Sequence, residues 1–223
     1  MATILEESGF DPNAELKVVG TNPVKHDGLD KVTGRAKFGA DAFLPGMLVG
    51  KILRSPHAHA VIKSIDTSKA EALPGVKAVV TRDDFPEKKE GTGAGDMTRN
   101  MMAREKALYD GHPVAAVAAT SERVAKKALK LIEVNYEVLP HVIDPVEAMN
   151  ADAPILHDYL RTKGAEKDED KPTNVTERMV TQLGDIDAGF EDADIIVERS
   201  YDSKPMHQGY IEPQACIADY SED

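Results

Sequence analysis

Apolar and polar residues alternate along several short stretches of the chain, with the period of two that is typical of half-buried β-strands. Short apolar runs rich in Val, Ile and Ala accompany them and favour buried strands. On this pattern strands are predicted at residues 31–38, 47–53, 60–65, 76–81, 114–119 and 131–139. Gly34 marks a bend in the first of these strands.

A short helix is predicted between the third and fourth strands. Asp66 or Thr67 supplies its N-cap, and Ser68 and Glu71 have the spacing of a capping box. The helix ends at residues 73–75, Leu-Pro-Gly, because proline cannot continue a helix and glycine accepts a positive φ.

A second helix is predicted over residues 122–130, with Ser121 as its N-cap. Val124, Ala128 and Leu131 recur on one helical face, which indicates an amphipathic helix that packs on the neighbouring strands. The strand before it and the strand after it then form a βαβ-like unit. Residues 83–106, with three glycines between 91 and 95, are expected to be a long connection without a helix.

The alternation of strands and helices predicts a mixed α/β (α+β) fold. Four parts are expected: an N-terminal arm (1–24), a mixed domain (25–145), a charged linker (146–175) and the opening of a second domain (176–223). The last part is predicted to contain a short helix at 185–192 and three strands, at 177–183, 195–201 and 215–220. Three strands and one helix are too few for an independent core, so the second domain is expected to be incomplete.

Composition narrows the classes of partner. The 223 residues carry a formal net charge of −12, and they include no Trp. Such a chain is a poor match for nucleic acid or for an anionic membrane surface, and no stretch resembles a signal peptide or a membrane span. A single cysteine, Cys216, excludes an internal disulfide framework. A cytoplasmic protein is therefore expected.

Candidate chemistry is sparse, and each candidate has a structural alternative. His57 and His59 have the spacing of two ligands on one strand face, but Pro56 and the neighbouring alanines favour a tight strand entry. Cys216 lies in an apolar run, which favours a buried side chain over a nucleophile. His112 fits a turn before a strand, and the chain has no G-x-S-x-G elbow for a hydrolase.

Several motifs in series carry a family resemblance. Residues 28–81 contain Gly-Leu-Asp-Lys-Val-Thr-Gly-Arg-Ala, then Arg-Ser-Pro-His-Ala-His-Ala at 54–60. Gly-Asp-Ile-Asp-Ala-Gly-Phe follows at 184–190 and Met-His-Gln-Gly-Tyr-Ile-Glu-Pro-Gln-Ala at 206–215. In this order the chain resembles the start of the molybdopterin-binding subunit of the xanthine dehydrogenase and aldehyde oxidase family, the molybdenum hydroxylases. The resemblance covers about residues 17–223.

This resemblance implies an α/β hammerhead domain followed by the first strands of the molybdopterin-binding domain. It also implies a hydroxylation that takes its oxygen from water at a molybdenum centre held by a pterin. The family's Gly-Gly-x-Phe-Gly cofactor loop, the glutamine beside the metal and the base glutamate are not found in this chain, so no catalytic residue and no metal ligand is carried over. The residues that distinguish substrates also lie in later domains.

The candidates to lie nearest the cofactor in an assembled enzyme are His207, Gln208 and Glu212. The alternative for Glu212 is that it anchors a turn before Pro213.

The resemblance therefore implies an N-terminal segment or small subunit of a molybdenum hydroxylase, architectural in role and inactive alone. Its implied partners are the remaining molybdopterin-binding chain, an iron–sulfur chain and usually an FAD chain, and it binds no cofactor alone. An exposed apolar patch at 195–220 is expected where that contact is missing. The alternative is a free-standing scaffold or ligand-binding module without redox chemistry. A natural split subunit, a truncated product and an interrupted reading frame all remain open.

Overall fold

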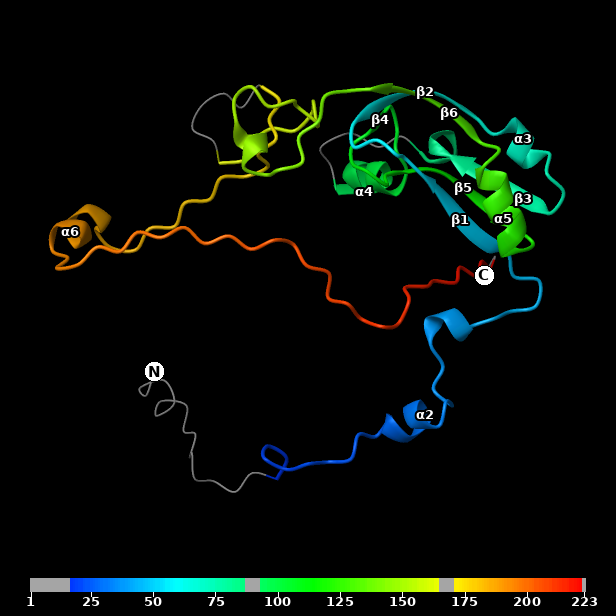
Figure 1. Ribbon diagram of the computed structural model, residues 1–223, viewed down its shortest axis with the longest axis horizontal. Coiled ribbons are helices and arrows are strands. Elements are labelled where there is room, and N and C mark those ends of the chain that lie inside the picture. The colour runs from blue at the N-terminus through cyan, green and yellow to red at the C-terminus, as the bar shows by residue number, and fades with distance from the viewer. Residues whose placement is uncertain (1–16, 87–92, 165–170, 222–223) are drawn as a thin grey trace. The chain divides into compact units, whose positions relative to one another are not determined.

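The computed structural model describes residues 17–86, 93–164 and 171–221 (Figure 1). Contacts between residues divide the chain into two units. Residues 45–201 form the first, called here the sheet unit. Residues up to 44 and from 202 onward form the second, called here the terminal unit. The four-part division expected from the sequence stays a prediction.

The sheet unit contains two small antiparallel sheets. One has the strand order β1-β5-β3 and the other β4-β2-β6. The strands are β1 (Val49–Arg54), β2 (Ala60–Asp66), β3 (Val76–Thr81), β4 (Lys106–Ala107), β5 (Pro113–Ala119) and β6 (Glu133–Val138). The helices are α3 (Ser68–Glu71), α4 (Gly93–Met101), α5 (Glu122–Leu129) and α6 (Ile186–Glu191), with 3₁₀ turns η2 (Arg82–Asp84) and η3 (Glu147–Met149).

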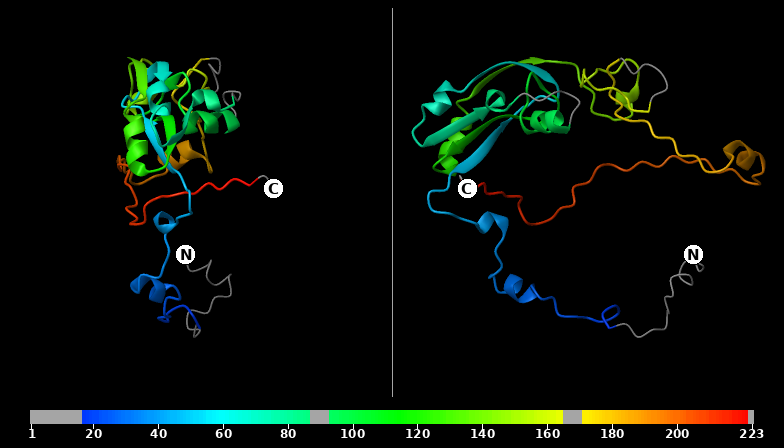
Figure 2. Two further views of the ribbon diagram at one scale, coloured as in Figure 1. Left: turned by 90° about the vertical axis from the view of Figure 1, so that its right-hand side faces the viewer. Right: turned by 180° about the vertical axis from the view of Figure 1, so that it is seen from behind.

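The main core lies between α5 and the first sheet. Ala115, Val117 and Ala119 of the central strand β5 have at most 1% of their surface exposed, and they pack against Ala125 and Ala128 of α5. Helix α5 contacts β1 as well as β5, and both views in Figure 2 show it beside these strands. Small side chains on both surfaces let the helix and the sheet approach closely.

Polar contacts fix the start of α5. The Ser121 hydroxyl accepts a hydrogen bond from the Val124 amide at 3.3 Å, which confirms the predicted N-cap. The Glu122 carboxylate lies 3.0 Å from the ammonium groups of both Lys51 and Lys126. It therefore joins the first turn of the helix to β1.

The second sheet has its own small core. Ile62 of β2 packs with Ala103 and Val114, and Val134 and Tyr136 of β6 cover the cluster. Val114 belongs to this cluster although its strand lies in the first sheet, because a shift of register between Leu53 and Arg54 interrupts the pairing of β1 with β5. The two sheets are thus linked through β5.

His112 is a fully buried histidine at the start of β5, in the turn position expected for it. Its Nδ1 accepts a hydrogen bond from the Leu108 amide at 3.2 Å, and its Nε2 lies 2.8 Å from the Arg99 carbonyl oxygen. The ring stacks on Tyr109 with 4.3 Å between centroids. This pairing requires the neutral form with the proton on Nε2, and burial lowers the pKa of His112 below its usual value.

Most strand predictions within the sheet unit are confirmed. The predicted strands at 47–53, 60–65, 76–81, 114–119 and 131–139 correspond to β1, β2, β3, β5 and β6. Both predicted helices form, as α3 and α5. The mixed α/β architecture is therefore confirmed.

The predicted strand at 31–38 is wrong, because helix α2 (Gly28–Val32) occupies its start. Lys31 pairs with Asp27 at 2.5 Å one helical turn away, and the Thr33 hydroxyl donates to the Leu29 carbonyl at 2.7 Å to close the helix. Within the described residues this segment has no neighbouring strand, so local hydrogen bonds determine its conformation.

Two further expectations inside the sheet unit are wrong. Strands β5 and β6 do not form a βαβ unit, because they lie in different sheets and both sheets are antiparallel. The segment expected to be a connection without a helix contains α4, which starts at Gly93. Residues 87–92 lie outside the described residues. The glycines that indicated a loop thus stand at the start of a helix, where glycine is tolerated.

Part of the expected charged linker is held by one side chain. The Asn174 carbonyl oxygen accepts a hydrogen bond from the Leu156 amide at 3.2 Å. Its NH₂ group donates to the carbonyls of Ala148 and Pro154 at 3.1 and 3.0 Å. Three backbone groups on one amide hold this irregular segment together.

Beyond residue 176 only part of the prediction is confirmed. Helix α6 forms where a helix was expected, with the Asp185 carboxylate accepting from the Ala188 amide at 3.0 Å. The strands expected at 177–183, 195–201 and 215–220 are wrong: Glu177 makes a single β-bridge with Lys163, and none of these segments belongs to a sheet among the described residues. Apolar and polar side chains still alternate there, but a strand needs a hydrogen-bonded neighbour.

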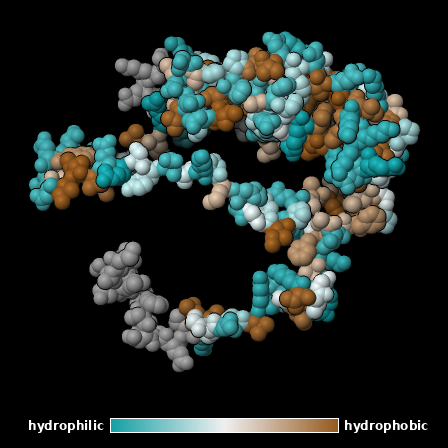
Figure 3. Space-filling view, viewed as in Figure 1, coloured by the Kyte–Doolittle hydropathy of each residue, from teal (hydrophilic) through white to brown (hydrophobic). Residues whose placement is uncertain are grey.

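Apolar side chains are exposed along the segment after α6, as expected. Ile195, Met206 and Ile211 have 81%, 91% and 98% of their surface exposed. Figure 3 shows hydrophobic residues at the surface of α6 and singly along the extended segment. Within the described ranges no helix combines the length and apolar content that crossing a bilayer would need.

The pH dependence of stability is a first prediction. The pKa of a histidine in the unfolded chain is about 6.5, whereas burial lowers the pKa of His112 in the folded chain. Its contribution is therefore fully present above the unfolded pKa and is lost as the pH falls through the window down to the lowered folded pKa. Urea titrations by circular dichroism should show this loss, and H112Q should abolish that part of the profile. An unchanged profile in H112Q would contradict the assignment.

A second prediction concerns Gly75, which ends α3 with φ +95°. A Cβ at this position would lie 2.9 Å from the Thr120 hydroxyl oxygen. G75A is therefore expected to lower the free energy of unfolding by roughly 1–2 kcal/mol in urea titrations. Gly50 in β1 is the control, because its φ is not positive and a Cβ there would meet nothing within 4 Å. Equal effects of G75A and G50A would refute the explanation.

Candidate functional site

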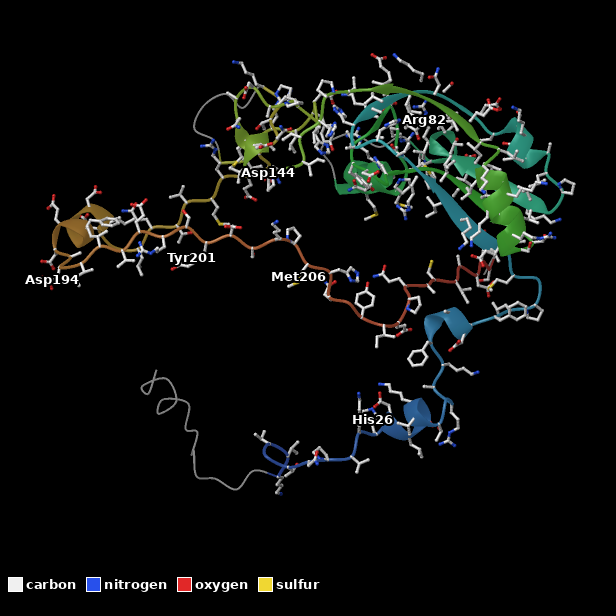
Figure 4. All side chains as sticks on the ribbon, viewed as in Figure 1. His26, Arg82, Asp144, Asp194, Tyr201 and Met206 are labelled. Carbon is white, nitrogen blue, oxygen red and sulfur yellow. The ribbon has the colours of Figure 1, made fainter. Side chains whose placement is uncertain are left out.

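The candidate residues His207, Gln208 and Glu212 lie on an extended, exposed segment of the terminal unit. Figure 4 labels Met206 at the start of this segment. The segment has no regular secondary structure, so its geometry depends on side-chain contacts.

His207 and Tyr210 form a local turn. His207 Nδ1 accepts a hydrogen bond from the Gly209 amide at 3.0 Å, and Gly209 has φ +70°. The centroids of the His207 and Tyr210 rings lie 5.3 Å apart, and the Gln214 side-chain amide donates a hydrogen bond to the Tyr210 hydroxyl. Gly209 permits the left-handed conformation that lets the imidazole fold back on its own backbone.

Glu212 makes the long-range contact of this segment. Its Oε1 accepts a hydrogen bond from the Gly39 amide at 3.1 Å, between residues 173 positions apart. A Cβ on Gly39 would lie 3.4 Å from the Ala215 Cβ, so the two backbones approach closely. The structure therefore gives Glu212 a role other than a local turn before Pro213.

The partner of Glu212 is a tight turn, residues 38–42, which contains the 3₁₀ turn η1 (Gly39–Asp41). The Asp41 carboxylate accepts a hydrogen bond from the Phe38 amide at 3.1 Å. Two neighbouring amides thus donate to two carboxylates, one local and one distant. A turn that directs backbone N–H groups outward in this way readily binds an acidic group.

A metal site of protein ligands is not formed by the described part of the chain, where no three His, Cys, Asp or Glu side chains cluster. Cys216 is exposed, so its predicted burial is wrong, because the strand expected around it has no neighbour among the described residues. The His, Cys, Asp and Glu side chains of the described residues therefore do not by themselves fit a molybdenum cofactor.

The His57 and His59 rings have separate structural partners. His57 packs edge-on against Tyr136, with 5.1 Å between centroids. His59 is buried, and its Nδ1 lies 2.7 Å from the Pro140 carbonyl oxygen. These contacts match the expected tight strand entry.

The sheet unit contains a cavity of about 310 Å³ beside β4. Two contacts engage charged side chains on its wall. The Arg99 guanidinium stacks on the Tyr159 ring, 4.2 Å from the ring centroid, and the Lys106 ammonium lies 2.6 Å from the Asp158 carboxylate. The hydrogen bond from Lys106 holds the pKa of the Asp158 carboxyl below its usual range. Charged residues thus form much of the cavity wall, and Lys106 and Asp158 neutralise each other there.

Gly39 is the residue of this site that the sequence did not indicate. It stands in Lys-Phe-Gly-Ala-Asp, and its only local signal is Asp41, two positions later. Nothing local indicates an acceptor 173 positions away. The role of Gly39 is apparent only in the folded chain, where its amide reaches Glu212.

Two family models match the chain. "Aldehyde oxidase and xanthine dehydrogenase, a/b hammerhead domain" matches residues 33–140, and "Molybdopterin cofactor-binding domain" matches residues 167–223. A probable hypoxanthine oxidase of Escherichia coli is 37% identical over 91% of the chain and 24% of its own length. The carbon monoxide dehydrogenase large chain of Afipia carboxidovorans is 35% identical over 97% of the chain and 27% of its own length.

Solved structures agree with these matches. A copper- and molybdenum-containing carbon monoxide dehydrogenase is 34% identical, with a TM-score of 0.60 over 79% of this chain and 23% of that one. The chain spans about a quarter of the length of these relatives. It belongs to the xanthine dehydrogenase and aldehyde oxidase family of molybdenum hydroxylases, as the hammerhead domain and the start of the molybdopterin-binding domain of the large subunit.

Proposed function

We propose that this chain is an architectural part of a molybdenum hydroxylase in the cytoplasm, either as the N-terminal segment or as a small subunit. The proposal rests on the order of the two matched family domains and on the exposed apolar side chains of the second one. Examples of these side chains are Ile195, Met206 and Ile211. Side chains of this kind are stabilised when another surface covers them.

The assembled enzyme would hydroxylate its substrate with oxygen from water. When bound, the molybdenum–pterin group supplies the oxidation. Because the described residues hold no group of His, Cys, Asp or Glu that could bind a metal, we expect the chain to need its partners for activity. The remaining molybdopterin-binding chain, an iron–sulfur chain and an FAD chain are its proposed partners. Relatives named as a large chain and as a complex subunit support a multi-chain assembly.

Within that enzyme, His207, Gln208 and Glu212 are the residues of this chain proposed to lie nearest the cofactor. Support comes from their place in the match to the molybdopterin cofactor-binding domain. The imidazole of His207 is held by Gly209 and Tyr210, so its orientation is defined before any partner binds. A residue oriented in advance binds a partner group with less loss of entropy.

The second candidate function is a scaffold or ligand-binding module that uses the hammerhead fold without redox chemistry. The packed core between α5 and β5 favours it, because the sheet unit has an interior of its own. The two candidates differ in whether a larger molybdenum-bearing chain accompanies this one.

Purification from the native host tests the two candidates. The chain is expected to co-purify with a larger chain, and native mass spectrometry with molybdenum quantification should find both in one complex. A lone, metal-free species would refute the hydroxylase proposal and leave the scaffold module.

The near-cofactor residues give a separate prediction. In the assembled enzyme H207A is expected to lower turnover by about tenfold or more while the chains still associate, because a group near the reacting centre is lost. The control is M179A, an exposed side chain outside this segment. Steady-state kinetics on both purified complexes supply the measurement. Equal turnover in H207A and the control would remove His207 from the site.

A further inference from the structure

One hydrogen bond joins Gly39, in the N-terminal part of the terminal unit, to Glu212, in its C-terminal part. The Gly39 amide donates to Glu212 Oε1 at 3.1 Å, and both residues belong to the terminal unit. Residues 45–201, which include the whole hammerhead match after residue 44, form a separate unit between them. Gly39 lies within the residues matched by the hammerhead model and Glu212 within those matched by the molybdopterin-binding model, so this hydrogen bond joins the two matched stretches.

The fit around this bond is close. A Cβ on Gly39 would lie 3.8 Å from Glu212 Oε1 and 3.4 Å from the Ala215 Cβ. These are ordinary van der Waals distances, so a small side chain at residue 39 would fit against the 212–215 segment. Contact at two positions, 212 and 215, defines how the segments face each other.

The electrostatics also favour the contact. The Asp41 carboxylate is engaged with the Phe38 amide at 3.1 Å, so the 38–42 turn already has one acidic acceptor. The Gly39 amide donates instead to the carboxylate of Glu212. A hydrogen bond to an ionised carboxylate is stronger than one to a neutral acceptor.

We propose that Glu212 is a positioning residue that holds the 38–42 turn against the start of the molybdopterin-binding domain. By this contact it fixes the segment that carries His207 and Gln208, and the turn becomes a structural part of that domain. Glu212 thus acts through the Gly39 backbone. The consequence for the cofactor rests on the proposed function, whereas the contact itself does not.

Nuclear magnetic resonance of the ¹⁵N-labelled, full 223-residue chain tests the bond. The Gly39 amide shift should move in E212A, which removes the acceptor, and should move less in E212Q, whose amide oxygen still accepts. Amide exchange at Gly39 should speed up several-fold in E212A and return towards the wild-type rate in E212Q. The control is D219A, an exposed acid of the same segment. An unchanged Gly39 amide shift and exchange rate in E212A would overturn the proposal.

A cross-link gives an independent test of the geometry. In a C216S background, Cys at positions 39 and 215 (G39C with A215C) should form a disulfide under mild oxidation, because the Cβ atoms would lie 3.4 Å apart, close to the usual range of about 3.5–4.5 Å. G34C with A215C is the matched control. Equal cross-linking of both pairs would overturn the proposal.

These measurements use the isolated chain, so they succeed or fail independently of assembly. Failure to co-purify with a molybdenum-bearing chain would refute the hydroxylase function and leave the Glu212 contact standing. Loss of the contact in solution would refute the positioning role and leave the family function standing.

Discussion

The close approach of α5 to the central strand β5 is the constraint on which the hammerhead domain depends. Ala115 and Ala119 on the strand, and Ala125 and Ala128 on the helix, have no exposed surface. A larger side chain at any of these four positions would separate the two elements and open the core around Val117. Strands β1 and β3 then pair on either side of β5, so the whole first sheet inherits its position from this contact.

The terminal unit has no such interior. Nearly all of its described residues are exposed, and its contacts are ion pairs such as Lys31 with Asp27 and hydrogen bonds such as that of Gly39 with Glu212. Hydrogen bonds at an exposed surface add little net stability, whereas buried apolar surface adds much more. The two units therefore differ in what holds them. One has a packed core, and the other has exposed apolar side chains and local contacts.

The sequence predicted those elements whose signals are local. The β3 strand and the Ser121 cap were identified because a β-branched run and a side chain next to a helix carry their own information. The segment around Cys216 has an equally apolar pattern, but a strand there depends on neighbours that the pattern does not contain. Helix α4 was missed because its first residues are glycines, which local rules assign to loops. Of the site, His207 and Glu212 were identified through family motifs, but the Gly39 donor was not, since its acceptor is distant along the chain.

The 173-residue separation of Gly39 and Glu212 also orders the events of biosynthesis. A ribosome releases the 38–42 turn first, then every strand of the hammerhead domain, and only afterwards the carboxylate that the turn binds. Domains generally fold as units during synthesis, so the hammerhead sheets are complete while the turn still lacks its acceptor. The 38–42 turn therefore stays without its distant acceptor while the hammerhead sheets form, and chain elongation itself sets the earliest moment at which the two segments can join.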